Sequence, residues 1–143
     1  MDKLLISACL LGVPCRYDGK SKPVASIERL REKYELIPIC PEQLGGLPTP
    51  RNPSERIGGR VVMEDGTDVT TQYQKGAQAA LELCLREGCV AAVLKERSPS
   101  CGSGEIYDGT FTRSLVAGDG VTAELLKENG IKVYGESEPD ALL

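Results

Sequence analysis

The chain alternates short hydrophobic runs with longer stretches in which apolar and polar residues recur at helical spacing. Short runs dominated by apolar residues are typical of strands buried on both faces, and they predict strands over residues 4–8, 35–39, 90–94 and 131–134. Apolar positions three and four residues apart predict helices over residues 24–33, about 71–87 and 122–129. Because strands and helices alternate, the pattern predicts an α/β fold: one compact three-layer domain with a small, mostly parallel sheet of about four strands flanked by helices.

Glycine and proline mark the connections between these elements. Residues 43–59 are rich in both and predict a loop. The segments 60–63 and 67–69, joined by an Asp-Gly turn, predict a short β-hairpin, and a second ribbon is expected around residues 106–112. The sequence has no internal repeat and no linker, so residues 1–143 are expected to form a single domain.

Composition narrows the classes of function. The net charge of −4 and the pI near 5.0 argue against a broad surface for the phosphate backbone of nucleic acids. Aromatic residues make up 4% of the chain and tryptophan is absent, which argues against a base-stacking platform for single strands. The sequence has neither a membrane-spanning apolar run nor a secretory leader. We therefore expect a cytoplasmic protein with no nucleic-acid or membrane partner, while the oligomeric state stays open.

The six cysteines are the first candidates for chemistry, because cytoplasmic thiols stay reduced and then indicate metal binding or catalysis. Cys9, Cys40 and Cys101 each lie at or just after the end of a predicted strand. Ligand sites of parallel α/β sheets lie beyond the carboxyl ends of the strands, so these three thiols are expected to meet at one edge of the sheet. Cys84, on an apolar helix face, and Cys89, at the start of a strand, are expected to be structural.

The spacing of the cysteines favours some metal centres over others. Structural zinc usually has four ligands with paired Cys-x-x-Cys spacing, and a redox pair needs the same spacing, which this chain lacks. An iron–sulfur cluster accepts thiolates from scattered positions. Three ligands would leave one iron without a protein donor, a soft Lewis acid able to bind a sulfur-containing ligand. From spacing alone, simple burial of free thiols stays an alternative, and the role of Cys15, in a polar loop, stays open.

Polar residues near these cysteines fit a ligand pocket. Glu42 is two residues from Cys40, and because the chain has no histidine, acid–base chemistry needs a group of this kind. Ser98 and the backbone N–H groups of residues 98–104 can donate hydrogen bonds to a ligand. The alternatives are a solvated loop carboxylate and a plain turn. Further candidates for binding a polar ligand, or else ordinary surface residues, are Arg16, Asp18, Arg51 and Ser100.

Four motifs occur in order along nearly the whole chain: SACLLGVPCRYDGK, CPEQLGGLPTPR, GTDVT and KERSPSCG. Together they resemble the thiouracil desulfidase family. The resemblance implies a compact α/β domain that carries a [4Fe–4S] cluster on three cysteines, with one iron not ligated by protein. It also implies an enzyme that acts on a small thiolated pyrimidine such as thiouracil. Sulfur would be removed by hydrolysis without net redox change, releasing sulfide and the oxo base.

Matched residue by residue, the resemblance points to Cys9, Cys40 and Cys101 as metal ligands and to Glu42 and Ser98 as catalytic residues. Glu42 would activate the attacking water, and Ser98 would relay a proton or hydrogen-bond the ring. Cys15 also lies within a matching motif, so it stays open whether it replaces one of the three ligands.

Three other functions compete with this hypothesis, and one is a small α/β ligand-binding domain with free thiols, which protein purified without oxygen and containing no iron would favour. An iron–sulfur or metal-binding sensor, or a sulfur-handling module without catalysis, would use the same cysteines. An enzyme that thiolates transfer RNA on a similar cluster fits less well, because the acidic sequence has no motif for an ATP-binding loop.

Overall fold

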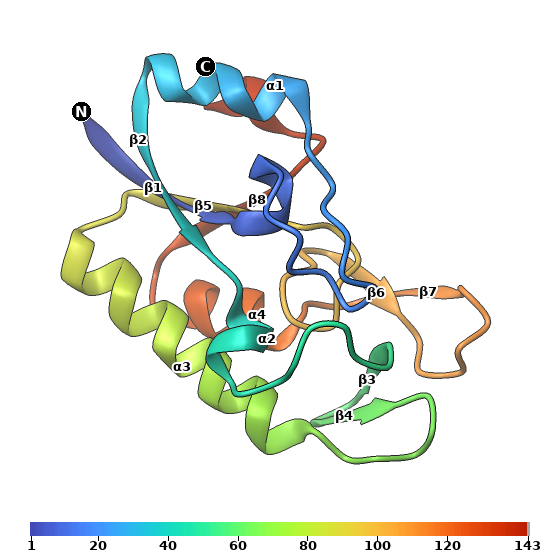
Figure 1. The fold of residues 1–143 in the computed structure, drawn as a ribbon. Coiled ribbons are helices and arrows are strands. Elements are labelled where there is room, and N and C mark those ends of the chain that lie inside the picture. Colours follow the sequence, from blue (N-terminus) through green and yellow to red (C-terminus); the bar gives the residue numbers. More distant parts are fainter. Residues whose placement is uncertain (143) are drawn as a thin grey trace.

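The computed structural model describes residues 1–142, and its centre is a sheet of parallel strands (Figure 1). Within the described residues this sheet has four strands, in the order β2 (Tyr34–Ile39), β1 (Asp2–Ser7), β5 (Ala91–Leu94) and β8 (Lys132–Gly135). Every neighbouring pair of strands runs parallel. The predicted fold class, an α/β fold with a small, mostly parallel sheet, is confirmed.

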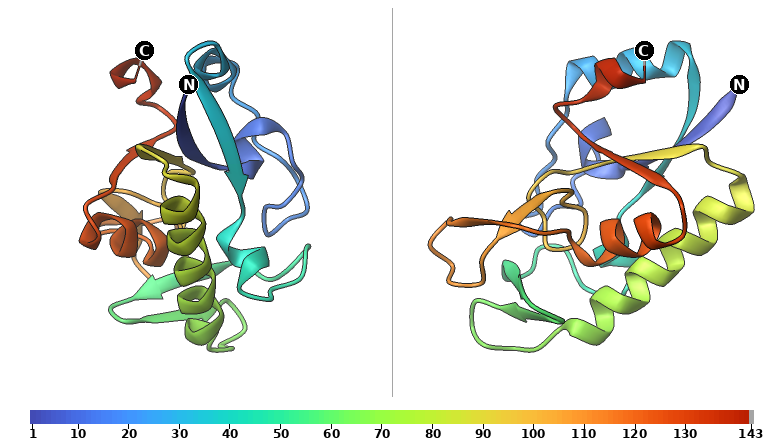
Figure 2. Two further views of the ribbon diagram at one scale, coloured as in Figure 1. Left: turned by 90° about the vertical axis from the view of Figure 1, so that its left-hand side faces the viewer. Right: turned by 180° about the vertical axis from the view of Figure 1, so that it is seen from behind.

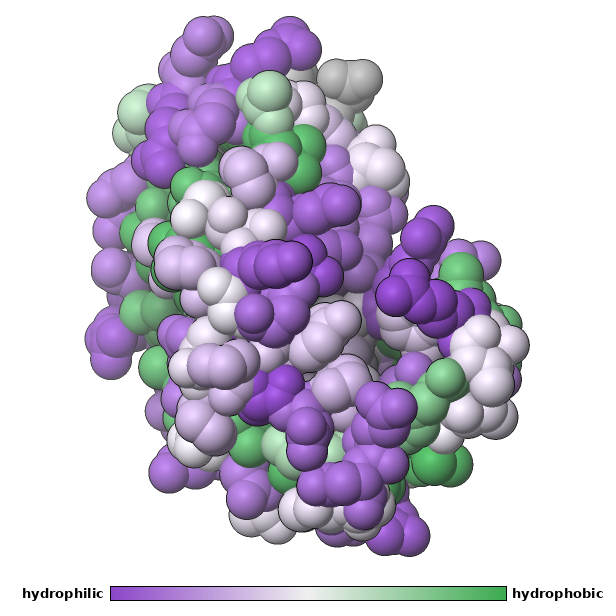
Figure 3. All heavy atoms as spheres, turned by 45° about the vertical axis from the view of Figure 1, so that its right-hand side comes forward, coloured by the Kyte–Doolittle hydropathy of each residue, from purple (hydrophilic) through white to green (hydrophobic). Residues whose placement is uncertain are grey.

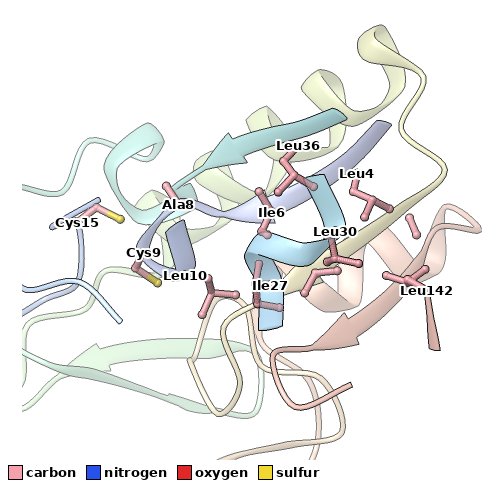
Figure 4. Packing of buried hydrophobic residues seen from close by; sticks show 12 residues of the cluster. Leu4, Ile6, Ala8, Cys9, Leu10, Cys15, Ile27, Leu30, Leu36 and Leu142 are labelled. Atoms are coloured by element: carbon pink, nitrogen blue, oxygen red, sulfur yellow. The ribbon is translucent and has the colours of Figure 1, made fainter. Parts of the chain in front are cut away.

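The side chains of β1 alternate between two clusters of buried residues, one on each face of the sheet. Leu4 and Ile6 belong to the first cluster, shown in Figure 4, and Leu5 belongs to the second. All three are fully buried. Burying such a side chain stabilises a fold by roughly 1.5–3 kcal/mol. Because both faces of the sheet are covered here, the centre of the strand is a run of consecutive apolar residues rather than an alternation of apolar and polar ones.

Helices cover the sheet on both sides (Figures 1 and 2). α1 (Ala25–Glu28) and the 3-10 turn η2 (Arg29–Glu32) contribute buried apolar residues to the first cluster. α3 (Thr70–Glu87) and α4 (Val121–Glu128) pack against each other and contribute to the second cluster. A last 3-10 turn, η3, spans Pro139–Ala141. The predicted three layers and the three predicted helical regions are therefore present.

The longest helix, α3, begins beside an acidic side chain. The Oδ1 atom of Asp68 accepts a hydrogen bond of 2.9 Å from the backbone N–H of Thr70. Hydrogen bonds from Thr70, and then the bond and charge of Arg60, hold the pKa of Asp68 down at about 2. The carboxylate therefore stays ionised near the positive end of the helix. At the other end, Gly88 stops the helix with a left-handed φ of 68°.

The predicted hairpin is present as part of a larger ribbon. Residues 60–63 and 67–69 meet in an antiparallel bridge between Val62 and Asp68, and the backbone N–H of Met63 donates a hydrogen bond of 2.8 Å to the carbonyl oxygen of Thr67. On its other side, β4 (Arg60–Met63) pairs with β3 (Ser54–Ile57). The turn between the two strands is formed by two adjacent glycines, and Gly58 has the left-handed φ of 58° that a tight hairpin turn needs. The prediction missed β3, which lies within the predicted loop of residues 43–59, because that strand follows a run rich in proline and glycine.

Two further elements border the carboxyl ends of the sheet. α2 (Pro41–Leu44) is a short helix directly after β2, with Cys40 as its N-cap residue. A hairpin of β6 (Glu105–Tyr107) and β7 (Leu115–Ala117) extends to the right in Figure 1. The ribbon predicted around residues 106–112 covers most of β6 but not its partner. Among the described residues, no helix is both long and apolar enough to cross a membrane.

Candidate active site

A cavity of about 560 Å³ lies beyond the carboxyl ends of β1, β2 and β5. Its wall starts where these strands stop, at Ser7, Ile39 and Lys95. The strand order reverses at β1, since β2 lies on one side of it and β5 on the other. Such a switch point is the usual place for a ligand in an open parallel sheet, and the volume suits a small molecule. Figure 3 brings this side of the molecule forward and shows a hollow between the main body and a projecting lobe.

Four cysteines among the described residues line this cavity, and they come from loops after three different strands. Cys9 lies in the 3-10 turn η1 (Ala8–Leu11), directly after β1, and Cys15 lies in the loop that follows. Both are at one end of the buried cluster in Figure 4. Cys40 is the residue after β2, and Cys101 lies in the turn region after β5. The predicted meeting of Cys9, Cys40 and Cys101 at one edge of the sheet is therefore seen in the structure.

The thiols influence one another. A hydrogen bond with Cys40 lowers the pKa of Cys15, but a hydrogen bond with Cys9 and burial outweigh it and raise the pKa to about 11. The hydrogen bond with Cys15, followed by burial, raises the pKa of Cys40. Burial raises the pKa of Cys101 to about 12, although a hydrogen bond with Ser7 lowers it in part. These three thiols carry protons at neutral pH, so binding a metal centre would release protons.

The arrangement of these thiols fits a cluster better than a single ion. Within residues 1–142, no three His, Cys, Asp or Glu side chains are grouped so that they could hold one metal ion. In an iron–sulfur cluster each thiolate binds a different iron, so the ligands surround a larger volume. Thiols from three separate loops around one cavity meet that requirement. The donor atoms are also the soft sulfur ligands that such clusters use.

Glu42 lies on the cavity wall, where Arg51 holds its carboxylate. The Nε atom of Arg51 donates a hydrogen bond of 2.9 Å to Oε2 of Glu42, and Nη2 donates to the same oxygen. The side chain of Arg51 is 3% exposed and that of Glu42 is 14% exposed. Burial lowers the pKa of Arg51, but the charge of Glu42 outweighs burial, so the pKa is raised. The two residues form a mostly buried ion pair.

Arg51 also connects two of the sequence motifs. Its Nη2 atom donates to the carbonyl oxygen of Cys15 at 3.1 Å. Its Nη1 atom donates to the carbonyl oxygen of Pro48 at 3.2 Å and to Oγ1 of Thr49 at 3.0 Å. A guanidinium has five N–H donors, and five hydrogen bonds join this one to protein acceptors. Arg51 therefore fixes Glu42 relative to the loop of Cys15.

Ser98 organises the turn that carries Cys101. Its Oγ atom accepts hydrogen bonds of 3.1 Å from the backbone N–H groups of Ser100 and Cys101. A hydroxyl that accepts in this way keeps its own proton to donate. Ser98 is part of the cavity wall, so it combines a structural role with a donor next to the ligand space.

Comparison with known proteins decides the family. The family model for 2-thiouracil desulfurase matches residues 4–138 of the chain. The chain belongs to the 2-thiouracil desulfurase family. A solved structure, that of the [4Fe–4S]-dependent thiouracil desulfidase TudS, has a TM-score of 0.94 and 49% identity, covering 99% of this chain and 95% of that chain. The uncharacterized protein YbbK of Bacillus subtilis (strain 168) is 42% identical over 150 residues, with 98% of this chain and 99% of YbbK covered. Membership confirms the predicted family and an enzyme class that cleaves carbon–sulfur bonds.

Not every predicted ligand-binding residue of this 2-thiouracil desulfurase family member reaches the cavity. Arg16 is part of the wall, whereas Asp18 and Ser100 are not among the described residues that line it. Asp18 accepts a hydrogen bond of 3.0 Å from the backbone N–H of Lys20 and so shapes its own loop. Ser100 is 1% exposed and shares a hydrogen bond of 2.8 Å with Thr122. Direct contact of either residue with a ligand stays a prediction.

The aromatic part of the desulfurase cavity is absent from the sequence-based prediction. Among the described residues, Tyr17, Tyr73, Tyr107 and Phe111 line the cavity, and they are four of the six aromatic residues in the chain. The helical spacing of Tyr73 indicates only core packing, and burial indeed raises its pKa. The other three lie in or next to loops, where no periodicity reports on packing. The only signal in the sequence that could have drawn attention to these three residues is the scarcity of aromatic residues in the chain.

Proposed function

We propose that this protein removes sulfur from a thiolated pyrimidine such as thiouracil by hydrolysis. The C=S group of the ring and water become C=O and sulfide, with no net oxidation or reduction. The observation that carries the proposal is that the four motif thiols and the Arg51-bound carboxylate of Glu42 line one cavity. The likeness to TudS, a [4Fe–4S]-dependent thiouracil desulfidase, supports the same cofactor and substrate class.

The proposed cluster ligands are Cys9, Cys40 and Cys101, with Cys15 as the residue that would replace one of them. Three protein ligands leave one iron of the cluster without a protein donor. When bound, the cluster supplies a soft Lewis acid that polarises the carbon–sulfur bond of the substrate. The cavity wall around the thiols then has to supply the proton acceptor, the proton donors and the surface that orients the ring.

Glu42 is the proposed proton acceptor. Both hydrogen bonds from Arg51 to Glu42 end on Oε2, so Oε1 receives no hydrogen bond from Arg51. We assign Oε1 the role of accepting a proton from water as the water oxygen attacks the ring carbon that bears sulfur. Ser98 supplies a hydroxyl donor to the ring or to the departing sulfur. Arg16, on the same wall, is a candidate to hydrogen-bond a ring oxygen.

Sulfide release from 2-thiouracil tests this proposal. Protein reconstituted with iron and sulfide without oxygen is expected to form sulfide and uracil in equal amounts, without added reductant. The rate should rise in proportion to the iron content of the preparation. Fully reconstituted protein that releases no sulfide from several thiolated pyrimidines would instead favour a sensor. Protein that takes up no iron would favour a ligand-binding domain with free thiols.

Arg51 is expected to act on the reaction through Glu42 and not through the substrate. Arg51→Met should lower kcat by roughly 10- to 100-fold, because a small misplacement of a reacting group has an effect of that size. KM should change less. If Arg51 bound the substrate directly, as the sequence suggests, KM would rise instead. Steady-state kinetics on preparations of equal iron content separate the two roles.

Two further variants make this test specific. Arg51→Lys keeps the positive charge but not the fork, so it should recover part of kcat. Removing one partner of a buried ion pair also destabilises a fold by about 3–5 kcal/mol, which urea unfolding would detect. In a Glu42→Gln background, Arg51→Met should lower kcat little further, since coupled residues are not additive. Independent, multiplicative losses would contradict the positioning role.

A further inference from the structure

The hairpin loop between β6 and β7 contributes an aromatic wall to the cavity. Tyr107, at the end of β6, and Phe111, in the loop, both line the cavity, and Phe111 is the single phenylalanine of the chain. Arg113, also in this loop, lines it as well. These residues follow Cys101, the last of the motif cysteines, in the sequence, and no motif in the chain marks them. The loop therefore supplies a surface that the proposed catalytic residues do not.

A buried carboxylate fixes the tip of this loop. Glu55, in β3, is 8% exposed, and its Oε1 atom accepts hydrogen bonds from the backbone N–H groups of Gly109 at 2.9 Å and Phe111 at 3.1 Å. Asp108 adds a second anchor by accepting a bond of 2.9 Å from the backbone N–H of Thr110. The two carboxylates together bind the three successive N–H groups of residues 109–111, and these charge-assisted hydrogen bonds hold the tip of the loop in one conformation.

The conformation held in this way is a strained one. Phe111 has a φ of 59° and Arg113 a φ of 62°, in the left-handed region that residues with side chains rarely adopt. Gly109, with a φ of 97°, brings the loop so close to β3 that an added Cβ would lie 2.3 Å from a side-chain atom of Ile57. Strain of this kind persists only where the surroundings impose it, and it concentrates at ligand sites. It indicates that the placement of Phe111 matters.

We propose that Phe111 is a specificity-determining residue, which packs its ring against the pyrimidine, and that Glu55 positions it for this contact. The inference rests on the proposed function, because the substrate ring is the flat partner that an aromatic wall would recognise. Stacking suits such a ring because it depends on the π-face and tolerates changes in ring substituents. The cluster would then select for sulfur, while the hairpin loop selects for an aromatic ring.

The test compares variants of the reconstituted holoenzyme with 2-thiouracil as substrate. Phe111→Leu keeps an apolar side chain but removes the flat ring, and it should raise KM roughly 5- to 150-fold, the range for loss of one base–aromatic stack. The turnover number should change less, and iron content should match wild type. Phe111→Tyr keeps the ring and should stay within a few-fold of wild type. Val116→Ala, on the outer strand of the same hairpin and 45% exposed, is the matched control and should leave KM unchanged.

Glu55 gives the second half of the test. Glu55→Leu removes the oxygen that accepts both hydrogen bonds from Gly109 and Phe111, and it should raise KM as Phe111→Leu does. Glu55→Gln keeps a carbonyl oxygen and should retain most of the affinity. Combined with Phe111→Leu, Glu55→Leu should add little, because the two residues act as one unit. Calorimetric binding of 2-thiouracil to Glu42→Gln protein, with and without Phe111→Leu, checks that the change in KM is a change in binding.

The outcomes separate this inference from the proposed function. Normal sulfide release by wild type together with an unchanged KM in Phe111→Leu would overturn the role of Phe111 alone. A raised KM in Phe111→Leu that Glu55→Leu does not share, with the loop variant folded and loaded with iron, would overturn the positioning role of Glu55. No sulfide release by fully reconstituted wild type would overturn the proposed function itself.

Discussion

The substitution Glu42→Gln is expected to leave the cluster in place and to lower turnover of 2-thiouracil by roughly 100-fold or more, the scale for removal of a general base. Glutamine has the shape of glutamate and still offers a carbonyl oxygen to Arg51, so the cavity wall should keep its form. It has no carboxylate to accept a proton from water. The chain contains no histidine that could take over this function.

Sulfide release at matched iron content measures this effect. Glu82→Gln, in α3, removes a carboxylate of the same type outside the cavity wall and serves as the control, with activity equal to wild type. Binding of 2-thiouracil to Glu42→Gln protein should persist, because the proposed role of Glu42 is in the reaction and not in affinity. Release at the wild-type rate by the glutamine variant would remove Glu42 from the mechanism.

Much of the fold was predictable from residues with a clear periodicity. The apolar runs that became β1 and β5 are buried on both faces, and a strand of that kind has few alternatives in a small α/β protein. α3 shows its apolar face over several turns and ends at Gly88, so its bounds were predictable to within one residue. The contact of β4 with residues 67–69 was predictable from its Asp-Gly turn, whereas β3 was not, because its four residues follow a run rich in proline and glycine.

Some residues of the candidate site were likewise predictable from the sequence, and others were not. Cysteines at strand ends could be placed together because the topology of parallel sheets brings such ends to one edge. The partner of Glu42 could not be identified, since Arg51 lies in a proline-rich loop whose path no periodicity constrains. Phe111 and Glu55 meet at the cavity through a hydrogen bond between residues 56 positions apart. Contacts of this kind depend on how loops fold back on the sheet, and local sequence patterns carry no record of them.

Single serine substitutions of the four cavity cysteines are expected to divide them into two groups. Serine has nearly the size of cysteine, but its hydroxyl is a poor, protonated ligand for iron, so a true ligand should lose the cluster and all activity together. We expect this for Cys9→Ser, Cys40→Ser and Cys101→Ser. Iron and acid-labile sulfide after anaerobic reconstitution, with the visible absorption spectrum, report the cluster, and sulfide release from 2-thiouracil reports activity.

Cys15 is the residue that this experiment has to place. Its thiol interacts with those of Cys9 and Cys40, and the Sγ atom of Cys40 lies 3.7 Å from the carbonyl oxygen of Cys15, so Cys15 is a near neighbour of two proposed ligands. If Cys40 is a ligand, the Cys15→Ser variant should keep most of its iron. If the Cys15→Ser variant loses iron and the Cys40→Ser variant keeps it, the third ligand is Cys15 and not Cys40. Cys84→Ala is the control, because Cys84 is fully buried in the second cluster and outside the described cavity wall. Cys84→Ala should lower the free energy of unfolding by about 1 kcal/mol through lost packing, and its iron content should equal that of wild type. Loss of iron from Cys84→Ala would show that the iron content of the cysteine variants follows their stability and not the loss of a ligand.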